Sequence, residues 1–167
     1  KQFHSLGANI VLVARRKDRL EAIARDLNHI RENSCAFIEA DLTDRGSLEK
    51  VTDFIKTNCI DVLINNAGIW HKVGDLETIS DEMILEVINT NLTSQILLTK
   101  KLLPHIRNRE NSFIVNIVSK SGITAQQGQS VYSASKWGLR GFTDVLRNDT
   151  KADKVHVIGV YQSGTNT

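Results

Sequence analysis

The stretch "DVLINNAGI" (residues 61–69) joins a short apolar run to two asparagines, an alanine and a glycine. Apolar runs of this length without alternation are typical of strands covered on both faces, as in a parallel sheet. Four similar runs occur elsewhere: "NIVLVA" (9–14), "CAFIEA" (35–40), "FIVNIV" (113–118) and "VHVIGV" (155–160). The sequence therefore predicts five strands of a parallel sheet.

Helical patterns, with apolar residues three and four positions apart, separate these runs. Their apolar positions are Leu20, Ile23, Ala24 and Leu27; Leu48, Val51 and Ile55; Leu85, Ile88, Leu92, Ile96 and Leu103; and Leu139, Phe142 and Val145. We expect Asp44 to cap the second helix, the third to end near Pro104 and the fourth to begin near Ser130. Strand–helix alternation of this kind predicts an α/β fold with a doubly wound, Rossmann-like parallel sheet.

The beginning of the chain departs from that pattern. "KQFHSLG" (1–7) is typical of the last turns of a helix closed by Gly7, whereas a doubly wound domain begins with a strand and a glycine-rich turn. No linker or internal repeat divides the rest of the chain. We therefore expect residues 1–167 to form a single, partial dinucleotide-binding domain that lacks its first strand and its glycine-rich loop.

Composition narrows the class of protein. The 167 residues are 41% hydrophobic and 24% charged, and the net charge of +2 is too small to favour nucleic acid or an anionic membrane surface as a partner. Cys35 and Cys59 have no metal-ligand spacing, so we predict no metal site and expect reduced thiols. No apolar run approaches the roughly 20 residues of a membrane helix. These features predict a soluble, cytoplasmic protein.

A tyrosine and a lysine stand one helical turn apart in "SVYSASKWGLRGF" (130–142). Tyr132 and Lys136 share a helix face at this spacing. A free tyrosine titrates near about 10, and a neighbouring ammonium group moves the pKa of the phenol toward neutral pH. The pair is therefore a candidate acid–base catalyst with its cationic partner, although two unrelated side chains can also share a face.

Two strand ends favour the catalytic interpretation. Ser119 follows the strand "FIVNIV", 13 residues before Tyr132, and Asn65 to Gly68 stand at the end of the predicted strand "DVLIN" (61–65). The carboxyl ends of parallel strands line the ligand crevice, where a hydroxyl can bind a substrate carbonyl. Trp70 and His71, which come next, could face a substrate or pack on the surface.

The motifs "NNAG", "NTNL" with Asn91, "NIVSKSG" with Ser119 and "YSASK" together resemble the short-chain dehydrogenase/reductase family, in its order and spacing and over the whole chain. The resemblance implies that Tyr132 is the general acid in carbonyl reduction and the base in alcohol oxidation. It implies that Lys136 lowers the pKa of Tyr132 and binds the nicotinamide ribose. Ser119 would hold the substrate oxygen, and Asn91 would position a water between Lys136 and solvent.

The same resemblance implies a set of residues that contact the cofactor. Besides Tyr132 and Lys136, they are Asp41 and Leu42 beside the adenine, Asn66, Ala67 and Gly68 beside the adenosine and ribose, Arg15, and Thr167 near the nicotinamide.

Charge bears on the choice of cofactor. The strand ending at Ala14 is followed by "RRKDR" (15–19), and the helix dipole disfavours cations at a helix N-terminus unless an anion binds there. Ala14 stands where NAD-dependent relatives carry an acid, and Arg15 could grip a 2′-phosphate with two hydrogen bonds. We expect NADP(H) rather than NAD(H), with a solvated basic turn as the alternative.

Two departures from the family pattern concern cofactor binding. The glycine-rich turn T-G-x-x-x-G-x-G, which holds the pyrophosphate, is absent, and Gln162-Ser163 stands where the family has Pro-Gly. A sheet without its first strand would have a gap. We therefore expect these residues alone to bind a dinucleotide poorly, and to be part of a longer protein.

The leading hypothesis is an NADP(H)-dependent oxidoreductase that transfers a hydride between nicotinamide and a carbonyl or alcohol substrate. The alternatives are a non-catalytic nucleotide-sensing or scaffold protein on the same fold, an inactive fragment of the enzyme, and a sugar-nucleotide epimerase or dehydratase, which the motif spacing disfavours. The resemblance also implies a homodimer or homotetramer. Phe142, Val145 and Leu146 could support such an assembly or pack inside the subunit.

Overall fold

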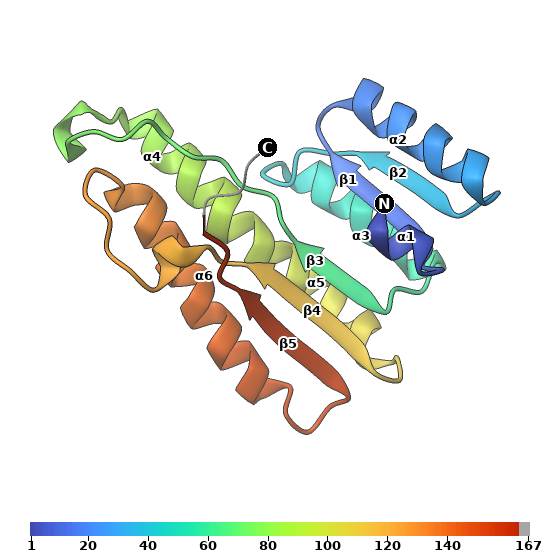
Figure 1. Cartoon of the computed structure of the whole chain (residues 1–167). Coiled ribbons are helices and arrows are strands. Elements are labelled where there is room, and N and C mark those ends of the chain that lie inside the picture. Colours follow the sequence, from blue (N-terminus) through green and yellow to red (C-terminus); the bar gives the residue numbers. More distant parts are fainter. Residues whose placement is uncertain (164–167) are drawn as a thin grey trace. The chain divides into compact units, whose positions relative to one another are not determined.

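The computed structural model describes residues 1–163. By their internal contacts the residues form two compact units, Lys1–Phe54 and the part from Ile55 onward, and each unit is described by itself. The strands form two parallel sheets, β1-β2 in the first unit and β3-β4-β5 in the second (Figure 1). Parallel strands joined by helices confirm the α/β class. The assignment of a single domain over 1–167 stays a prediction.

The first unit is a β-α-β arrangement preceded by a short helix. Its elements are α1 (Gln2–Ser5), β1 (Ile10–Ala14), α2 (Lys17–Ile30), β2 (Cys35–Glu39) and the first part of α3 (Arg45–Thr57). The two strands pair in parallel, from Ile10 opposite Cys35 to Ala14 opposite Glu39.

Apolar residues at helical spacing fix α2 to this sheet. Ala24 and Leu27 are buried together with Cys35, and the apolar side chains of β1 pack against them. Gly7 has a φ of 95°, which closes α1 in the left-handed conformation expected of a glycine C-cap. The carboxylate of Asp44 accepts a hydrogen bond from the Ser47 amide at 2.7 Å, which confirms the predicted cap of α3.

The second unit contains three parallel strands in the order β3-β4-β5. Its elements are β3 (Val62–Asn65), η1 (Leu76–Thr78), α4 (Asp81–Ile88), the π-helical turn η2 (Asn89–Thr93), α5 (Ser94–Arg107), β4 (Ser112–Ile117), η3 (Lys120–Gly122), α6 (Ser130–Asp149) and β5 (Val155–Val160). All five predicted strands are therefore present, within one residue of the predicted bounds.

One face of the β3-β4-β5 sheet is buried and carries the core. Leu63, Ile114 and Val157 are buried on it, whereas Ile64 and Ile158 on the other face are each 42% exposed. Successive right-handed β-α-β crossovers that advance in one direction place their helices on the same side of a sheet.

The predicted third helix differs from the structure in two ways. A π-helical turn at 89–93 separates α4 from α5, and α5 continues past Pro104 to Arg107. A proline inside a helix removes one backbone hydrogen bond and costs about 3 kcal/mol. Leu102 and Ile106, on either side of Pro104, are almost fully buried, and their packing offsets that cost.

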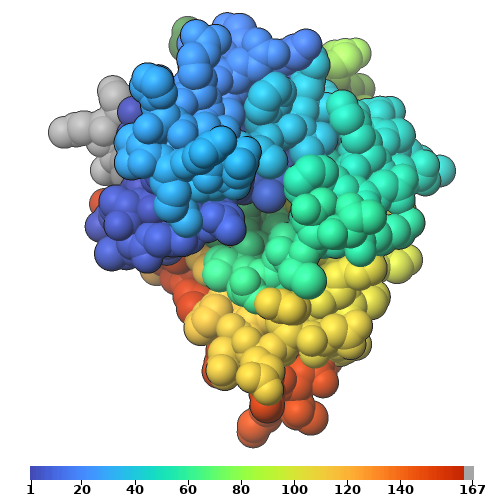
Figure 2. Space-filling view, turned by 90° about the vertical axis from the view of Figure 1, so that its right-hand side faces the viewer, coloured from blue at the N-terminus to red at the C-terminus, as the bar shows by residue number. Residues whose placement is uncertain are grey.

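Ion pairs join the connections at the amino ends of β3, β4 and β5. Arg107 contacts Asp153 at 2.8 Å, and Arg109 contacts Asp61 at 2.9 Å. Figure 2 shows the connection between α5 and β4 (yellow) next to the connection between α6 and β5 (red-orange). These pairs are partly exposed, so each stabilises the fold by at most about 1 kcal/mol.

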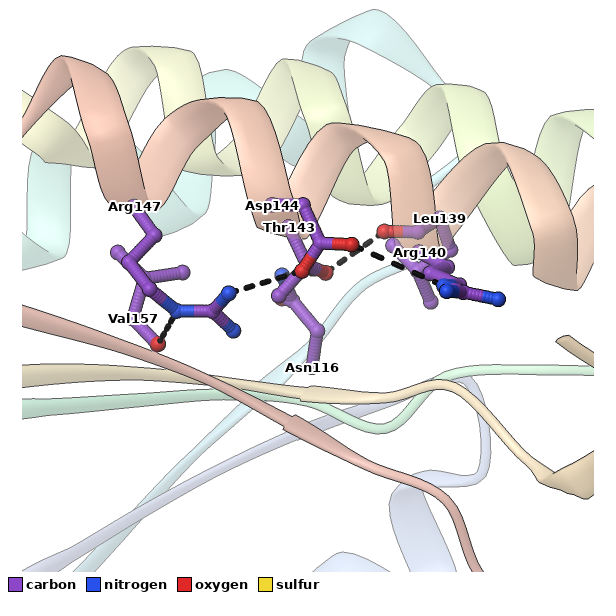
Figure 3. Close-up of polar contacts among 7 residues, drawn as sticks. All are labelled: Asn116, Leu139, Arg140, Thr143, Asp144, Arg147 and Val157. Carbon is purple, nitrogen blue, oxygen red and sulfur yellow. Dashed lines mark hydrogen bonds and ion pairs between the residues drawn. The ribbon is translucent and has the colours of Figure 1, made fainter. Parts of the chain in front are cut away.

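A buried polar chain fixes α6 to β4. The Asn116 side chain donates to the Thr143 hydroxyl at 2.8 Å, and that hydroxyl donates to the Leu139 carbonyl at 2.6 Å (Figure 3). The Asn65 amide donates to the Asn116 side chain at 2.8 Å and to the Thr99 hydroxyl at 2.9 Å, which connects the chain to β3 and α5. Nearer the helix end, Arg147 donates to the Val157 carbonyl of β5 at 3.0 Å. These contacts set the position of α6 on the sheet.

Replacement of Thr143 by valine tests this chain. The change keeps the volume and leaves the buried Asn116 amide without its acceptor, so the free energy of unfolding should fall by about 1–3 kcal/mol. Urea denaturation measures the change. Thr78→Val, which removes an exposed hydroxyl, is the control and should change the free energy by less than about 0.5 kcal/mol. Equal effects of the two substitutions would contradict the role of the chain.

Candidate active site

The carboxyl ends of β3 and β4 lie at the same edge of the three-stranded sheet, since the strands are parallel and Asn65 pairs with Asn116. The segments that follow these strands and the start of α6 border a cavity of about 420 Å³. Its lining residues are Trp70, Ser119, Lys120, Ser121, Gln126, Tyr132, Gln162 and Ser163. Two predicted catalytic residues, Ser119 and Tyr132, therefore share one cavity.

Ser119 has a backbone conformation that side-chain-bearing residues rarely adopt. Its φ is 88° and its ψ is 153°, in a region populated mainly by glycine. Its amide donates to the Val160 carbonyl at 3.2 Å, and its hydroxyl accepts from the Ser121 amide at 3.2 Å. Strained residues of this kind cost about 1–3 kcal/mol and cluster at functional sites. The surrounding contacts hold the Ser119 hydroxyl at the cavity wall.

Lys136 lies one turn after Tyr132 on α6 and is buried, with 4% of its surface exposed. Its Nζ donates to the Ile117 carbonyl at the end of β4 at 2.8 Å, and lies 5.8 Å from the centre of the Tyr132 ring. Burial disfavours the charged amine and lowers the pKa of Lys136 to about 8. The helix spacing thus brings the ammonium group beneath the phenol that faces the cavity.

Asn91 occupies the π-helical turn η2 and is fully buried. Its side chain accepts from the Ile69 amide at 2.8 Å and donates to the Ile69 carbonyl at 2.9 Å. The same amide donates to the Ser135 hydroxyl at 3.2 Å, which in turn donates to the Tyr132 carbonyl at 2.6 Å. Single π turns inside helices are frequent at functional sites. Asn91 therefore connects the segment after β3 to the first turns of α6.

Gly68 lies next to two of these side chains. A Cβ at Gly68 would lie 3.4 Å from the Asn91 Oδ1 and 3.8 Å from the Lys136 Nζ. Beside it, Ala67 accepts a hydrogen bond from the buried Gln95 side chain. Asn66 and Gly68 themselves are exposed. The segment "NAG" (66–68) is therefore an open rim beside Lys136, where glycine leaves room for a ligand.

The predicted residues of the first unit also lie together. Arg15 and Asp41 form an exposed ion pair of 3.9 Å. Hydrogen bonds from the Thr43 hydroxyl and amide, with the Arg15 charge as a smaller contribution, lower the pKa of Asp41. Leu42 is partly exposed beside them. Thr167 lies outside the described residues.

Two contributors to the site have only weak signals in the sequence. Gln95 looks like an ordinary helix residue, and the π turn at Asn91 interrupts a pattern that predicts one regular helix. Trp70 lines the cavity, which agrees with the interpretation that it could face a substrate, whereas His71 is buried with 3% exposure.

Within residues 1–163, no three His, Cys, Asp or Glu side chains form a metal-binding cluster, and no helix is long and apolar enough to span a bilayer.

Comparison with known proteins identifies the family. The family model described as short chain dehydrogenase matches residues 1–167. The chain belongs to the short-chain dehydrogenase family. The mouse dehydrogenase/reductase SDR family member 7 is 36% identical over 153 residues, which cover 89% of this chain and 45% of that protein. The chain spans about half the length of the curated relatives it matches.

Solved structures of short-chain dehydrogenases share the fold. An alcohol dehydrogenase from Thermococcus sibiricus, in complex with 5-hydroxy-NADP, has a TM-score of 0.92 at 22% identity and covers 99% of this chain and 69% of its own. A 3-ketoacyl-(acyl-carrier-protein) reductase from Brucella melitensis, in complex with NADH, has a TM-score of 0.90 at 24% identity and covers 98% and 68%. The Rossmann-like fold predicted from the sequence is confirmed.

Substitution of Lys136 by methionine tests its burial through the pH dependence of stability. The unfolded chain keeps this proton up to the ordinary pKa of 10.5, whereas the folded lysine releases it from about 8. The unfolded state therefore binds more protons between these values, and the free energy of unfolding should rise with pH across the window, by about 3 kcal/mol in total. The difference between wild type and Lys136→Met, measured by urea denaturation from pH 7 to 11, should show this rise.

The control is Lys100→Met, which removes an exposed lysine of α5. Its difference from wild type should stay nearly constant with pH. A constant difference for Lys136→Met as well would show that this lysine is not buried in the folded protein.

Proposed function

We propose that the protein containing this chain is an NADP(H)-dependent oxidoreductase that acts on a carbonyl or alcohol substrate, with Tyr132 as its general acid and base. One observation carries the proposal: Tyr132 and Ser119 line the same cavity, with the buried Lys136 5.8 Å from the Tyr132 ring. Membership of the short-chain dehydrogenase family supports the reaction class. The nicotinamide, when bound, supplies or accepts the hydride.

The residues beside Lys136 suit the nicotinamide-ribose end of such a cofactor. Lys136 carries three N–H donors when charged, and the Ile117 carbonyl accepts one of them. Gly68 keeps the space beside the Lys136 Nζ clear, since a Cβ there would lie 3.8 Å from it. The remaining Lys136 donors are then free to bind ribose hydroxyls. The sequence contains no glycine-rich turn for the pyrophosphate, so these residues account for only part of the cofactor.

The proton chemistry follows from the placement of three groups. In carbonyl reduction, the Tyr132 hydroxyl donates its proton to the substrate oxygen as the adjacent carbon gains the hydride. In alcohol oxidation, the phenolate takes that proton back. The Lys136 ammonium stabilises the phenolate by its positive charge, and the Ser119 hydroxyl donates a hydrogen bond to the substrate oxygen. Asn91 is assigned to hold a water between Lys136 and solvent.

The charges of this chain favour NADP(H) over NAD(H) as the cofactor. The two solved relatives hold an NADP derivative and NADH respectively. Arg15 is exposed at the end of β1, where a guanidinium can make two hydrogen bonds to a 2′-phosphate. Within residues 1–163, Arg15 forms an ion pair with Asp41, which lies 3.9 Å away and is partly exposed, so the pair can separate at little cost.

We also propose that the enzyme acts on a small carbonyl or alcohol substrate, is located in the cytoplasm and forms a homodimer or homotetramer. Val145 and Trp137 support an assembly through α6, since they are 58% and 48% exposed on that helix. Leu146 is buried and packs inside the subunit, while Phe142 is half-buried.

Tyr132→Phe in the full-length protein tests the catalytic assignment. Loss of the phenolic proton should lower kcat by about 10²–10⁴-fold, since a positioned acid–base group contributes that much. Nicotinamide absorbance with a panel of ketones and aldehydes measures the rate. Tyr161→Phe removes the hydroxyl of the second tyrosine and should leave kcat within about two-fold of wild type. An active Tyr132→Phe enzyme would contradict the proposal.

Arg15→Ala tests the cofactor preference. A charge-assisted hydrogen bond contributes about 1.5–3 kcal/mol, so KM for NADPH should rise about 10–100-fold with little change in KM for NADH. Arg25→Ala, an exposed arginine of α2, is the matched control. Equal increases of KM for NADPH and NADH, or no increase for either, would show that Arg15 does not bind the 2′-phosphate.

A further inference from the structure

The helix that carries Tyr132 begins without a side-chain cap from the preceding residue. Gln129, at the cap position of α6, makes no capping hydrogen bond with its side chain. The first four amides of a helix have no partner within the helix, and a buried amide left unpaired is costly. The start of α6 therefore needs an acceptor from elsewhere in the chain.

His71 supplies such an acceptor from the segment that follows β3. Its Nε2 lies 3.3 Å from the Tyr132 amide, which donates to it across 61 residues of sequence. The imidazole is buried, with 3% of its surface exposed, and its Nδ1 lies 2.9 Å from the Lys72 carbonyl. Since a backbone amide can only donate, Nε2 accepts and Nδ1 carries the hydrogen that is donated to Lys72. Both ring nitrogens are thus used, and the ring has one defined orientation.

The segment around His71 is fastened at both of its ends. At the start, the Asn91 side chain pairs with both backbone groups of Ile69. At the end, the Gly74 amide donates to the Gly128 carbonyl at 3.2 Å, and a Cβ at Gly128 would lie 2.5 Å from the Val73 side chain. Residues 69–74 therefore lie directly against the residues that lead into α6.

This segment also carries one wall of the cavity. Trp70 lines the cavity together with Tyr132, and it directly precedes His71 in the chain. The hydrogen bond that the Tyr132 amide donates to the His71 side chain therefore connects the segments that carry two cavity-lining aromatic residues. A change in that contact would alter both the direction of the phenol and the width of the cavity.

We propose that His71 is a positioning residue, which caps α6 and holds the Tyr132 backbone at a fixed distance from residues 69–74, the segment that contains Trp70. The inference rests on the proposed function in one respect: the phenol it positions is the proton donor. His71 itself touches no reacting atom. Its contribution should therefore appear in kcat, with little effect on the affinity for the cofactor.

Three substitutions of His71 in the full-length protein separate positioning from simple packing. His71→Gln keeps an acceptor near the position of Nε2, whereas His71→Leu keeps the volume and removes the acceptor. His71→Asn stays polar, but its amide is too short to reach the Tyr132 amide. We expect kcat to fall about 10-fold or more in the Leu and Asn variants, to remain within about three-fold in His71→Gln, and KM for the cofactor to change less than about three-fold in all.

His4→Leu is the matched control. His4 is also buried, at 4% exposure, and its Nε2 lies 2.7 Å from the Ser34 hydroxyl in the first unit. This variant should lose stability with kcat unchanged. A comparable loss of kcat in His4→Leu would show that the effect of the His71 variants is one of general stability, and would overturn the inference.

Hydrogen exchange at the Tyr132 amide gives a readout that needs no activity. Measured by NMR, the exchange rate should rise about 10-fold or more in His71→Leu and His71→Asn and stay near wild type in His71→Gln and His4→Leu. An unchanged exchange rate of the Tyr132 amide in His71→Asn overturns the inference, and so does a wild-type kcat in that variant. If His71→Leu does not fold, the results for His71→Asn are sufficient to test the inference. If Tyr132→Phe proves active, the proposed function fails, whereas the exchange rates still decide whether His71 caps α6.

Discussion

The site depends on the placement of one buried cation. The Lys136 ammonium lies against a backbone carbonyl of β4, at Ile117, rather than in water. Removal of a charge from water is costly, so the fold must hold this side chain by other contacts. The polar chain from Asn116 to Thr143, further along the same helix, supplies such contacts. Lys136 can therefore remain beneath Tyr132 although its burial is unfavourable.

The two ends of the β3-β4-β5 sheet differ in character. At the amino ends, exposed ion pairs such as Arg107–Asp153 join the connections and add modest stability. At the carboxyl ends, the chain has several unfavourable features: the backbone of Ser119, the buried Lys136, and the Asn65 and Gln95 side-chain oxygens, which have no hydrogen-bond partner among the residues that the structure describes. Unfavourable groups that persist at one edge of a sheet are typical of a functional site.

The strands and most helices could be predicted because each depends on a local pattern. Apolar runs gave all five strands, and the four-residue spacing placed Tyr132 and Lys136 on one face of α6. The common cavity of Ser119 and Tyr132 also followed, since the carboxyl ends of parallel strands meet at one edge. Local spacing and sheet geometry were sufficient for these features.

The remaining features depend on contacts between distant segments. The π turn at Asn91 is accompanied by the pairing of its side chain with Ile69, 22 residues earlier, and no helical pattern contains that information. Likewise, the burial of His71 follows from its bond to an amide 61 residues away. Proline usually ends a helix, so the sequence predicted a helix end near Pro104. The buried neighbours of Pro104 instead stabilise the helix as far as Arg107. Tertiary packing overrides local preference at each of these positions.

The most direct test is a crystal structure of the full-length protein with NADP⁺ and an alcohol or ketone inhibitor. We expect the ligand oxygen to lie about 2.6–3.2 Å from both the Tyr132 and Ser119 hydroxyls, the range of productive hydrogen bonds. We also expect the Lys136 amine to face the nicotinamide ribose. A ligand oxygen bound away from both hydroxyls, or a Lys136 side chain turned out to solvent, would show that these three groups do not form the catalytic site.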